Sequence, residues 1–220
     1  MRTCVRAAAA AAVVLAAGSA AQAEIIYATT QLGVLVSFDS ASPGNLLSGV
    51  AISGLAMNEQ VRGIDFRPAD GRLYAVGSLG NIYTLNVTTG AASQVSTLSE
   101  QLNGSNFGTD FNPTVDRLRV VSSTNQNLRV NVDTGAAIVD GTLAYGPGDP
   151  NFGASPSVVH AGYTNSVAGA TSTQLFVIDS ALDALVQQNP ANAGTLTTIG
   201  ALGVDATEIG GFDISGATGT

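Results

Sequence analysis

The chain has 220 residues and a formal net charge of −8, with no lysine and a single cysteine, Cys4. So acidic a chain lacks the positive surface by which proteins bind nucleic acid or anionic membranes, which excludes these partners. Charged residues make up only 11% of the chain, whereas there are 26 glycines. Short β-branched runs broken by Gly, Asn, Asp and Pro are typical of many short strands and turns. We therefore expect an all-β protein, long enough for one sizeable core.

Residues 1–23 have the order of a secretory signal peptide. Two arginines give a positive start, an apolar run follows over residues 7–17, and the segment ends in A-Q-A. The apolar run is about half of the ~20 residues that a membrane-spanning helix needs. We predict cleavage after Ala23, which leaves residues 24–220 as an exported domain, periplasmic or extracellular, without a membrane segment. Cleavage also removes the cysteine, so the mature domain has no disulfide or thiolate chemistry.

The mature part of the chain repeats itself. The sequence G-I-D-F-R-P at residues 63–68 recurs as G-T-D-F-N-P at residues 108–113, and each copy is followed four residues later by Arg-Leu. At the same offset of 45, Y-T-L-N-V-T-T-G-A-A at residues 83–92 aligns with L-R-V-N-V-D-T-G-A-A at residues 128–137. A period of 45 to 52 residues with several strands per unit is typical of β-propeller blades.

Weaker copies flank these two units. Residues 35–40 (L-V-S-F-D-S) and 175–180 (L-F-V-I-D-S) resemble one strand of the unit, and G-F-D-I at residues 211–214 restarts its first strand. We predict a β-propeller-like fold of short antiparallel four-stranded blades, about four units with the start of a fifth. Because the sequence ends inside that fifth unit, we expect a ring that further residues or another chain would complete. A β-sandwich is the alternative fold, but it would not explain the period.

These repeated segments resemble the bacterial family called domain of unknown function 4394. The resemblance runs from Ile26 to Ile214 and rests most on four stretches, at residues 63–74, 107–121, 163–171 and 188–205. It implies an exported, propeller-like domain with roughly one further blade after the G-F-D-I element. It implies no activity and no catalytic residues.

Features that recur between units are more typical of the scaffold than of a functional site. Asp65 with Arg72, and Asp110 with Arg117, recur at one spacing, and we interpret each as an ion pair or turn cap inside its blade. An alternative places Asp65, Asp110 and Asp213, which occupy equivalent positions in three units, around one divalent metal at the mouth of the channel.

Features that break the repeat are candidates for ligand binding. Arg119 and Arg129 face each other across a predicted hairpin, which is unfavourable unless an anion or a carboxylate lies between them. Asp149 and Asn151 lie in an inserted loop and offer oxygen ligands for Ca²⁺. The loop lacks the spacing and closing Glu of a known calcium loop, which favours a plain rigid turn.

His160 is the only histidine, which excludes a metal site made of several histidines. It lies close to Tyr163 at the start of the fourth unit, and both are candidate binding residues. We interpret a lone histidine of this kind as a satisfied polar residue rather than as a general base.

The chain has neither a G-x-S-x-G elbow nor a phosphate-binding glycine loop. We predict a non-enzymatic binding or interaction module without a cofactor, whose extracellular or periplasmic ligand is a glycan or a protein. The lack of tryptophan weakens the glycan version, since only Tyr27, Tyr145 and Tyr163 could replace the usual stacking platform. The alternative is a propeller hydrolase or lactonase that depends on a divalent metal such as Ca²⁺, for which the chain carries no motif.

Overall fold

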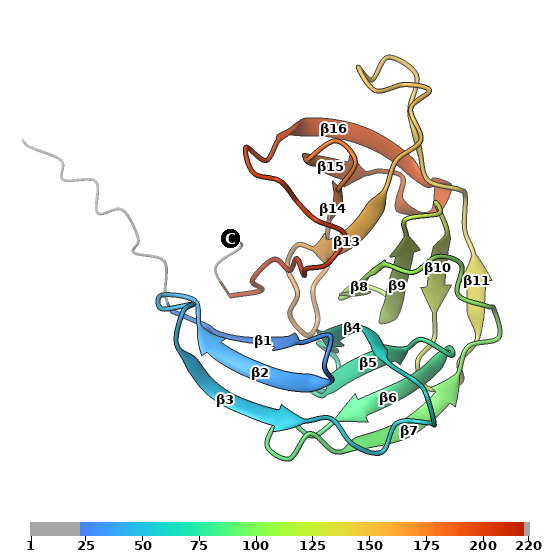
Figure 1. The fold of residues 1–220 in the computed structure, drawn as a ribbon. Helices are drawn as coiled ribbons and strands as arrows, with labels where there is room; N and C mark the ends of the chain where they lie inside the picture. Colours follow the sequence, from blue (N-terminus) through green and yellow to red (C-terminus); the bar gives the residue numbers. More distant parts are fainter. Residues whose placement is uncertain (1–22, 218–220) are drawn as a thin grey trace, which may run out of the picture.

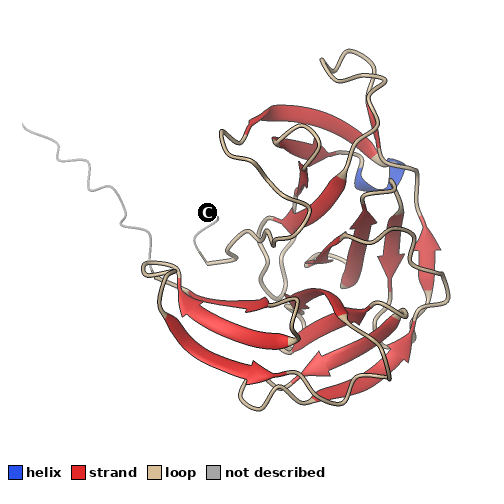
Figure 2. Cartoon of the chain, viewed as in Figure 1, coloured by secondary structure: helices blue, strands red, loops and turns tan. Residues whose placement is uncertain are grey.

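The computed structural model describes residues 23–217, which form four small sheets arranged around a centre (Figures 1 and 2). The predicted β-propeller is confirmed, and the chain does not form the alternative β-sandwich. Residues 1–22 of the predicted signal peptide lie outside the described part. Within residues 23–217, no helix is long and apolar enough to cross a membrane.

The strands of each blade follow one another in chain order as an antiparallel meander. Blade 1 comprises β1 (Ile25–Thr29), β2 (Val34–Asp39) and β3 (Leu46–Ala51). Blade 2 comprises β4 (Val61–Phe66), β5 (Leu73–Gly77), β6 (Asn81–Leu85) and β7 (Ala92–Thr97). Blade 3 comprises β8 (Phe107–Asn112), β9 (Arg117–Ser122), β10 (Asn127–Val130) and β11 (Ala137–Val139).

Blade 4 departs from this pattern by one added strand. It comprises β13 (Val158–Tyr163), β14 (Leu175–Asp179), β15 (Ala184–Gln188) and β16 (Thr195–Ala201), with the short 3₁₀ helix η1 (Ala191–Ala193) before β16. The added strand, β12 (Ala144–Tyr145), pairs with β16 in parallel. After β16 the chain returns toward the centre of the ring, and residues 202–217 form no further strand (Figure 1).

Equivalent turn residues recur in the hairpins of all four blades. One turn side chain in each blade accepts a hydrogen bond from the backbone N–H two residues further on. These residues are Asp39, Asn86, Asn131 and Asp179. In blades 2 and 3 the same turns end in Gly90 and Gly135, whose φ angles of 73° and 76° favour glycine.

The first strands of neighbouring blades contact each other near the centre of the ring, in the pairs β1–β4, β4–β8 and β8–β13. Glycine permits this approach at the third of these contacts. A Cβ on Gly108 of β8 would lie 2.6 Å from the carbonyl carbon of His160 on β13. The apolar core accordingly consists of three clusters, one at each junction between neighbouring blades. Each cluster contains one of the buried residues Leu35, Ile82 and Val177.

Candidate functional site

One position in the first strands places acidic residues at the centre of the ring. Asp65 on β4 and Asp110 on β8 occupy this position, each directly before the phenylalanine that pairs with the first leucine of the next strand. In blade 4 the same position is Gly162. Asp213 lies in the segment after β16, where the G-x-D motif restarts.

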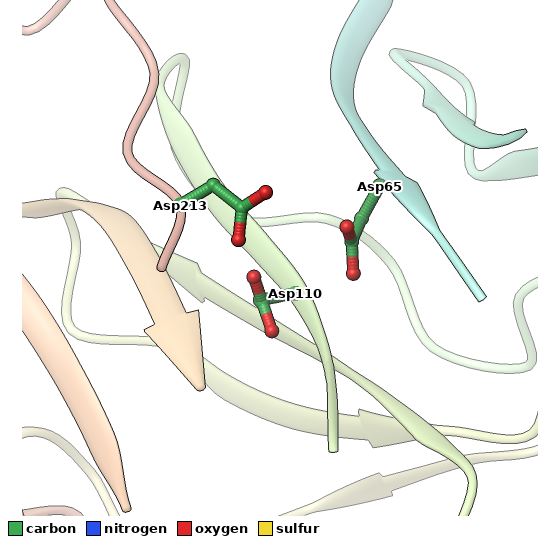
Figure 3. A group of neighbouring side chains, drawn as sticks. All are labelled: Asp65, Asp110 and Asp213. Atoms are coloured by element: carbon green, nitrogen blue, oxygen red, sulfur yellow. The ribbon is translucent and has the colours of Figure 1, made fainter. Parts of the chain in front are cut away.

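The three carboxylates of this central acidic cluster (Asp65, Asp110 and Asp213) point toward one another (Figure 3). One oxygen atom of each lies within 4.8 Å of the corresponding atoms of the other two. Asp110 is buried, with 1% of its surface exposed, whereas Asp65 is half-buried and Asp213 is exposed. The structure thus brings together carboxylates of blade 2, blade 3 and the segment after β16.

Two of these carboxylates also connect neighbouring blades. Asp65 Oδ2 accepts a hydrogen bond of 2.6 Å from the backbone N–H of Phe111, and Asp110 Oδ1 accepts one of 3.1 Å from the backbone N–H of Tyr163. Each aspartate thus binds the first strand of the next blade. The other oxygen of Asp110 has no hydrogen-bond donor among residues 23–217.

The predicted ion pairs inside the blades are wrong. Arg72 lies at the end of the turn before β5 and pairs at 2.7 Å with Asp70 in the same turn. Arg117 donates instead to the backbone carbonyl of Asp116, at 2.7 Å. The reason is the register, because Asp65 lies opposite Tyr74 rather than Arg72 and its side chain turns toward the ring centre.

The cluster is electrostatically unfavourable when all three groups are ionised. Burial raises the pKa of Asp65 well above its ordinary value, and the charge of Asp213 raises it further. Burial, and then the charges of Asp65 and Asp213, raise the pKa of Asp110 in the same way. The pKa of Asp213 is also raised, chiefly because its carboxyl group is partly enclosed although the residue as a whole is exposed. No arginine or histidine in the described part of the chain pairs with any of the three.

The donor set fits a hard divalent cation. All three groups offer carboxylate oxygens, the ligands that Ca²⁺ and Mg²⁺ prefer, and no sulfur or imidazole ligand belongs to the cluster. Two oxygens on opposite sides of Ca²⁺ lie about 4.6–5.2 Å apart, whereas on Mg²⁺ they lie only about 4.0–4.2 Å apart. All three oxygens lie within 4.8 Å of one another, a separation that one Ca²⁺ can span.

Arg119 and Arg129 lie opposite each other on β9 and β10, as predicted. The group between them is the carboxylate of Asp140, which accepts from Arg119 at 2.7 Å and from Arg129 at 3.0 Å. Arg119 is 2% exposed and also donates to Asn192 Oδ1 at 2.7 Å and to the hydroxyl of Tyr163. The two arginines are therefore held by an internal anion, which sequence reasoning missed because Asp140 follows β11 outside the matched blocks.

The inserted loop forms an internally bonded turn. The Asp149 carboxylate accepts hydrogen bonds from the backbone N–H groups of Asn151 and Thr198, and the Asn151 amide donates to Thr198 Oγ1. Both candidate side chains thus fix the loop against β16. Neither belongs to the central acidic cluster.

His160 and Tyr163 lie on the same strand but have different surroundings. His160 Nε2 lies 3.2 Å from the carbonyl oxygen of Thr207, and burial lowers the pKa of the imidazole, which favours a neutral histidine. Tyr163 lines a cavity of about 290 Å³ together with Gln188. Sequence reasoning had not singled out Gln188, which aligns with an apolar position of the repeat.

Comparisons with known proteins identify the family of the chain. Residues 34–220 match the family described as Domain of unknown function (DUF4394). No curated protein matches the chain. Among solved structures, the chain is similar to a puromycin hydrolase, at 16% identity and a TM-score of 0.40, over 76% of this chain and 24% of that one. It is also similar to BBS1N in complex with ARL6DN, at 12% identity and a TM-score of 0.37, over 81% of this chain and 54% of that one. The chain thus spans about a quarter and about half of these two proteins, and neither likeness bears on function.

Proposed function

We propose that this chain, which belongs to the family Domain of unknown function (DUF4394), is an exported, non-enzymatic binding module. Its ring holds a divalent cation, Ca²⁺, at its centre. Asp65, Asp110 and Asp213 are the protein ligands of this cation. The cation orders the first strands of neighbouring blades and so keeps the surfaces that bind the module's ligand in a fixed arrangement.

The observation that carries this proposal is the state of Asp110. Its side chain is buried, one of its oxygens has no donor among residues 23–217, and two further carboxylates lie within 4.8 Å. Two carboxylate charges at this separation repel each other by about 3–4 kcal/mol at an effective dielectric constant of 20. Either a proton or a cation must offset this repulsion at neutral pH, and the all-oxygen donor set suits a cation.

Melting temperature with and without Ca²⁺ tests the proposal. Free Ca²⁺ at 100 times its dissociation constant should stabilise the protein by about 2.7 kcal/mol. For a domain of this size, each kcal/mol raises the melting temperature by about 2–4 °C, so a shift of roughly 5–10 °C over EDTA is expected.

Two variants give this measurement a matched control. In Asp110→Asn the Ca²⁺ shift should disappear, whereas in Asp205→Asn, an exposed position outside the cluster, the full shift should remain. An unchanged melting temperature in the parent protein, or an equal shift in Asp110→Asn, would overturn the proposal.

A metal-dependent hydrolase or lactonase is the second candidate, and the exposure of Asp213 favours it. A cation at the cluster would be open to solvent on that side, and an open coordination position is what metal-assisted hydrolysis requires. Turnover of ester or lactone substrates that needs Ca²⁺ and is lost in Asp110→Asn would establish this function. A binding module shows the Ca²⁺ shift in melting temperature without turnover.

A further inference from the structure

Blade 1 has three strands, whereas blades 2 and 3 have four. The turn side chains identify the strand that blade 1 lacks. Asp39 ends β2 and Asn86 follows β6, and each accepts a hydrogen bond from the backbone N–H two residues further on. β2 is therefore equivalent to β6, the third strand of blade 2. Because β1 pairs with β2 as β5 pairs with β6, β1 is equivalent to β5, the second strand. Blade 1 thus lacks the innermost strand, which β4 supplies in blade 2.

An aromatic contact supports this equivalence. Tyr27 of β1 and Tyr74 of β5 hold the same register position relative to the two turn residues. Tyr74 packs edge-on against Phe111 on the first strand of blade 3, with ring centroids 5.5 Å apart. Tyr27 packs in the same way against Phe66 on the first strand of blade 2, with centroids 5.4 Å apart. β1 therefore holds the second place of its blade although it comes first in the chain, and it forms the open edge of its sheet.

The segment after β16 lies where the next innermost strand of the ring belongs. β13 packs closely on β8, since a Cβ on Gly108 would lie 2.6 Å from the carbonyl carbon of His160. The segment packs on β13 in turn, since a Cβ on Gly162 would lie 3.1 Å from Phe212 Cε1 and 3.2 Å from Ile214 Cγ1. It therefore follows β13 around the centre as β13 follows β8, and it lies between blades 4 and 1 (Figure 1).

The other side of the segment reaches the start of β1. The Ser215 hydroxyl donates to Glu24 Oε1 at 2.6 Å, and Glu24 directly precedes β1. This contact fits the register of blade 2, in which the aspartate of the G-x-D motif lies opposite Tyr74. The same register in blade 1 places Asp213 opposite Tyr27, and Ser215 then lies beside Glu24. The motif, the packing on β13 and this hydrogen bond thus agree on one position for the segment.

We propose that residues 211–215 pair with the open edge of β1 as the innermost strand of blade 1. Residues 202–217 form no strand in the structure, so this pairing adds a ladder of backbone hydrogen bonds to contacts that are already present. Those contacts come from Phe212, Ile214 and Ser215 and not from the Asp213 carboxylate, so the pairing does not require the cation proposed above.

The segment is a better partner for this edge than a second copy of the chain. An open edge offers unpaired backbone groups to any extended chain, and within one molecule the segment is always within reach. Its effective concentration at β1 therefore exceeds that of a second copy in dilute solution. The pairing also closes the ring, and Asp213 becomes the aspartate of blade 1, at the position that Asp65 and Asp110 hold in blades 2 and 3.

A pair of engineered cysteines tests the register. In the full chain with Cys4→Ser, the variant Ile26→Cys, Ile214→Cys changes two residues that the proposed pairing sets opposite each other. Their Cα atoms would lie about 4.5–5.5 Å apart, a distance that a disulfide spans. We expect diamide to form an intramolecular disulfide in dilute protein, seen as a faster-migrating monomer on a non-reducing gel, in EDTA and in Ca²⁺ alike. Formation in EDTA separates this pairing from the proposed function.

The matched control is Ala28→Cys, Ile214→Cys, which shifts the pair by two residues. Its Cα atoms would lie about 7–8 Å apart, beyond the usual reach of a disulfide, so we expect cross-linking to be roughly ten-fold slower. Equal rates in the two variants would contradict the register. A disulfide that forms only between two molecules would show that the edge of β1 takes a second copy instead.

Amide hydrogen exchange in the unsubstituted protein gives a measurement that does not depend on how the variants fold. The backbone N–H groups of residues 211–215 that face β1 should exchange about 100-fold or more slowly than in an unfolded chain, in EDTA and in Ca²⁺. Exchange at the rate of an unfolded chain would overturn the pairing. Protection that appears only in Ca²⁺ would overturn its independence of the cation.

Discussion

Blade 3 contains two buried carboxylates with opposite surroundings. Asp140 lies between Arg119 and Arg129, and its oxygens accept charged hydrogen bonds of 2.7 and 3.0 Å. Asp110 lies among other carboxylates and receives only the backbone N–H of Tyr163. The pKa values show the contrast, because that of Asp110 is raised by burial and neighbouring charge. Burial also acts to raise the pKa of Asp140, but hydrogen bonds from Arg129 and Arg119 outweigh it and the pKa is lowered.

The ion network around Asp140 contains its own counter-charges, whereas the acidic cluster around Asp110 does not. The charge of Asp140 is offset by two arginines of the chain itself, so this carboxylate needs no further counter-charge. The charges around Asp110 are balanced by no residue among those described. Burial of a charge alone therefore does not mark a binding site, whereas burial without a counter-charge does.

The largest effect is expected from breaking the balanced network. Asp140→Asn leaves two opposed arginines, one of them buried, without their anion. Removing one partner of a buried ion pair costs about 3–5 kcal/mol. We expect the free energy of unfolding in urea to fall by that amount, against no more than ~0.5 kcal/mol for Asp205→Asn. A loss below 1 kcal/mol in Asp140→Asn would show that the arginines find another anion.

The same substitution at the other buried carboxylate, Asp110, should raise the free energy of unfolding rather than lower it. In EDTA at pH 7, Asp110→Asn removes an unbalanced charge and keeps an oxygen that can accept from Tyr163. We expect an increase of roughly 1–3 kcal/mol in the free energy of unfolding, on the scale of relieving one unsatisfied buried charge. In saturating Ca²⁺ the variant should be less stable than the parent. A variant that is destabilised in EDTA as well would remove the distinction between the two carboxylates.

The pH dependence sharpens the comparison further. The raised pKa values of Asp65 and Asp110 mean that their protonated forms are favoured in the folded state. In EDTA their contribution to stability is thus present below the unfolded pKa of about 3.9 and is lost as the pH rises through the folded values. The lowered pKa of Asp140 acts in the other direction, since its contribution is present above that value and is lost as the pH falls through the folded one.

Urea midpoints measured between pH 4 and pH 8 check these directions. Relative to the double variant Asp65→Asn, Asp110→Asn, the parent protein in EDTA should lose stability as the pH rises from ~4. Added Ca²⁺ should make this difference in stability less dependent on pH. A difference that does not depend on pH would mean that the two carboxylates keep their ordinary pKa values.

The smallest effect is expected at the surface. Arg72 is exposed and pairs with Asp70 in the turn before β5. Exposed ion pairs contribute about 0.2–1 kcal/mol, so Arg72→Ala should lower the free energy of unfolding by no more than that. Substitutions of Asp140 and Asp110 in the interior should change the free energy of unfolding by clearly more than this. A larger loss would mean that the hydrogen bond from Arg72 to Tyr74 also supports the buried guanidinium of Arg67, which donates to the same hydroxyl.

Much of the fold followed from the repeat. The offset of 45 between Asp65 and Asp110 predicted equivalent strands, and ring geometry then brings equivalent positions to one centre. The predicted ion pair between Asp65 and Arg72 failed because a short spacing along the chain does not place two side chains on the same face of a hairpin.

Contacts between blades could not be predicted in the same way. A repeat shows which positions are equivalent, but not which side chain of the next blade each one meets. The guanidinium of Arg67, which follows β4, donates to Asp133, which follows β10 and lies 66 residues away in the sequence. Asp140 was missed for a related reason, because it lies where the two matched blocks have already ended.

The hydrogen bond from Tyr163 to Asp110 connects the central acidic cluster with the ion network of Asp140. The backbone N–H of Tyr163 donates to Asp110, while the hydroxyl of the same residue accepts from Arg119, which pairs with Asp140. A shift of β13 that improves one contact is therefore transmitted to the other within a single residue. A double-mutant cycle of Asp110→Asn and Asp140→Asn, measured in EDTA and in Ca²⁺, would give the coupling free energy between the two carboxylates and its dependence on the cation.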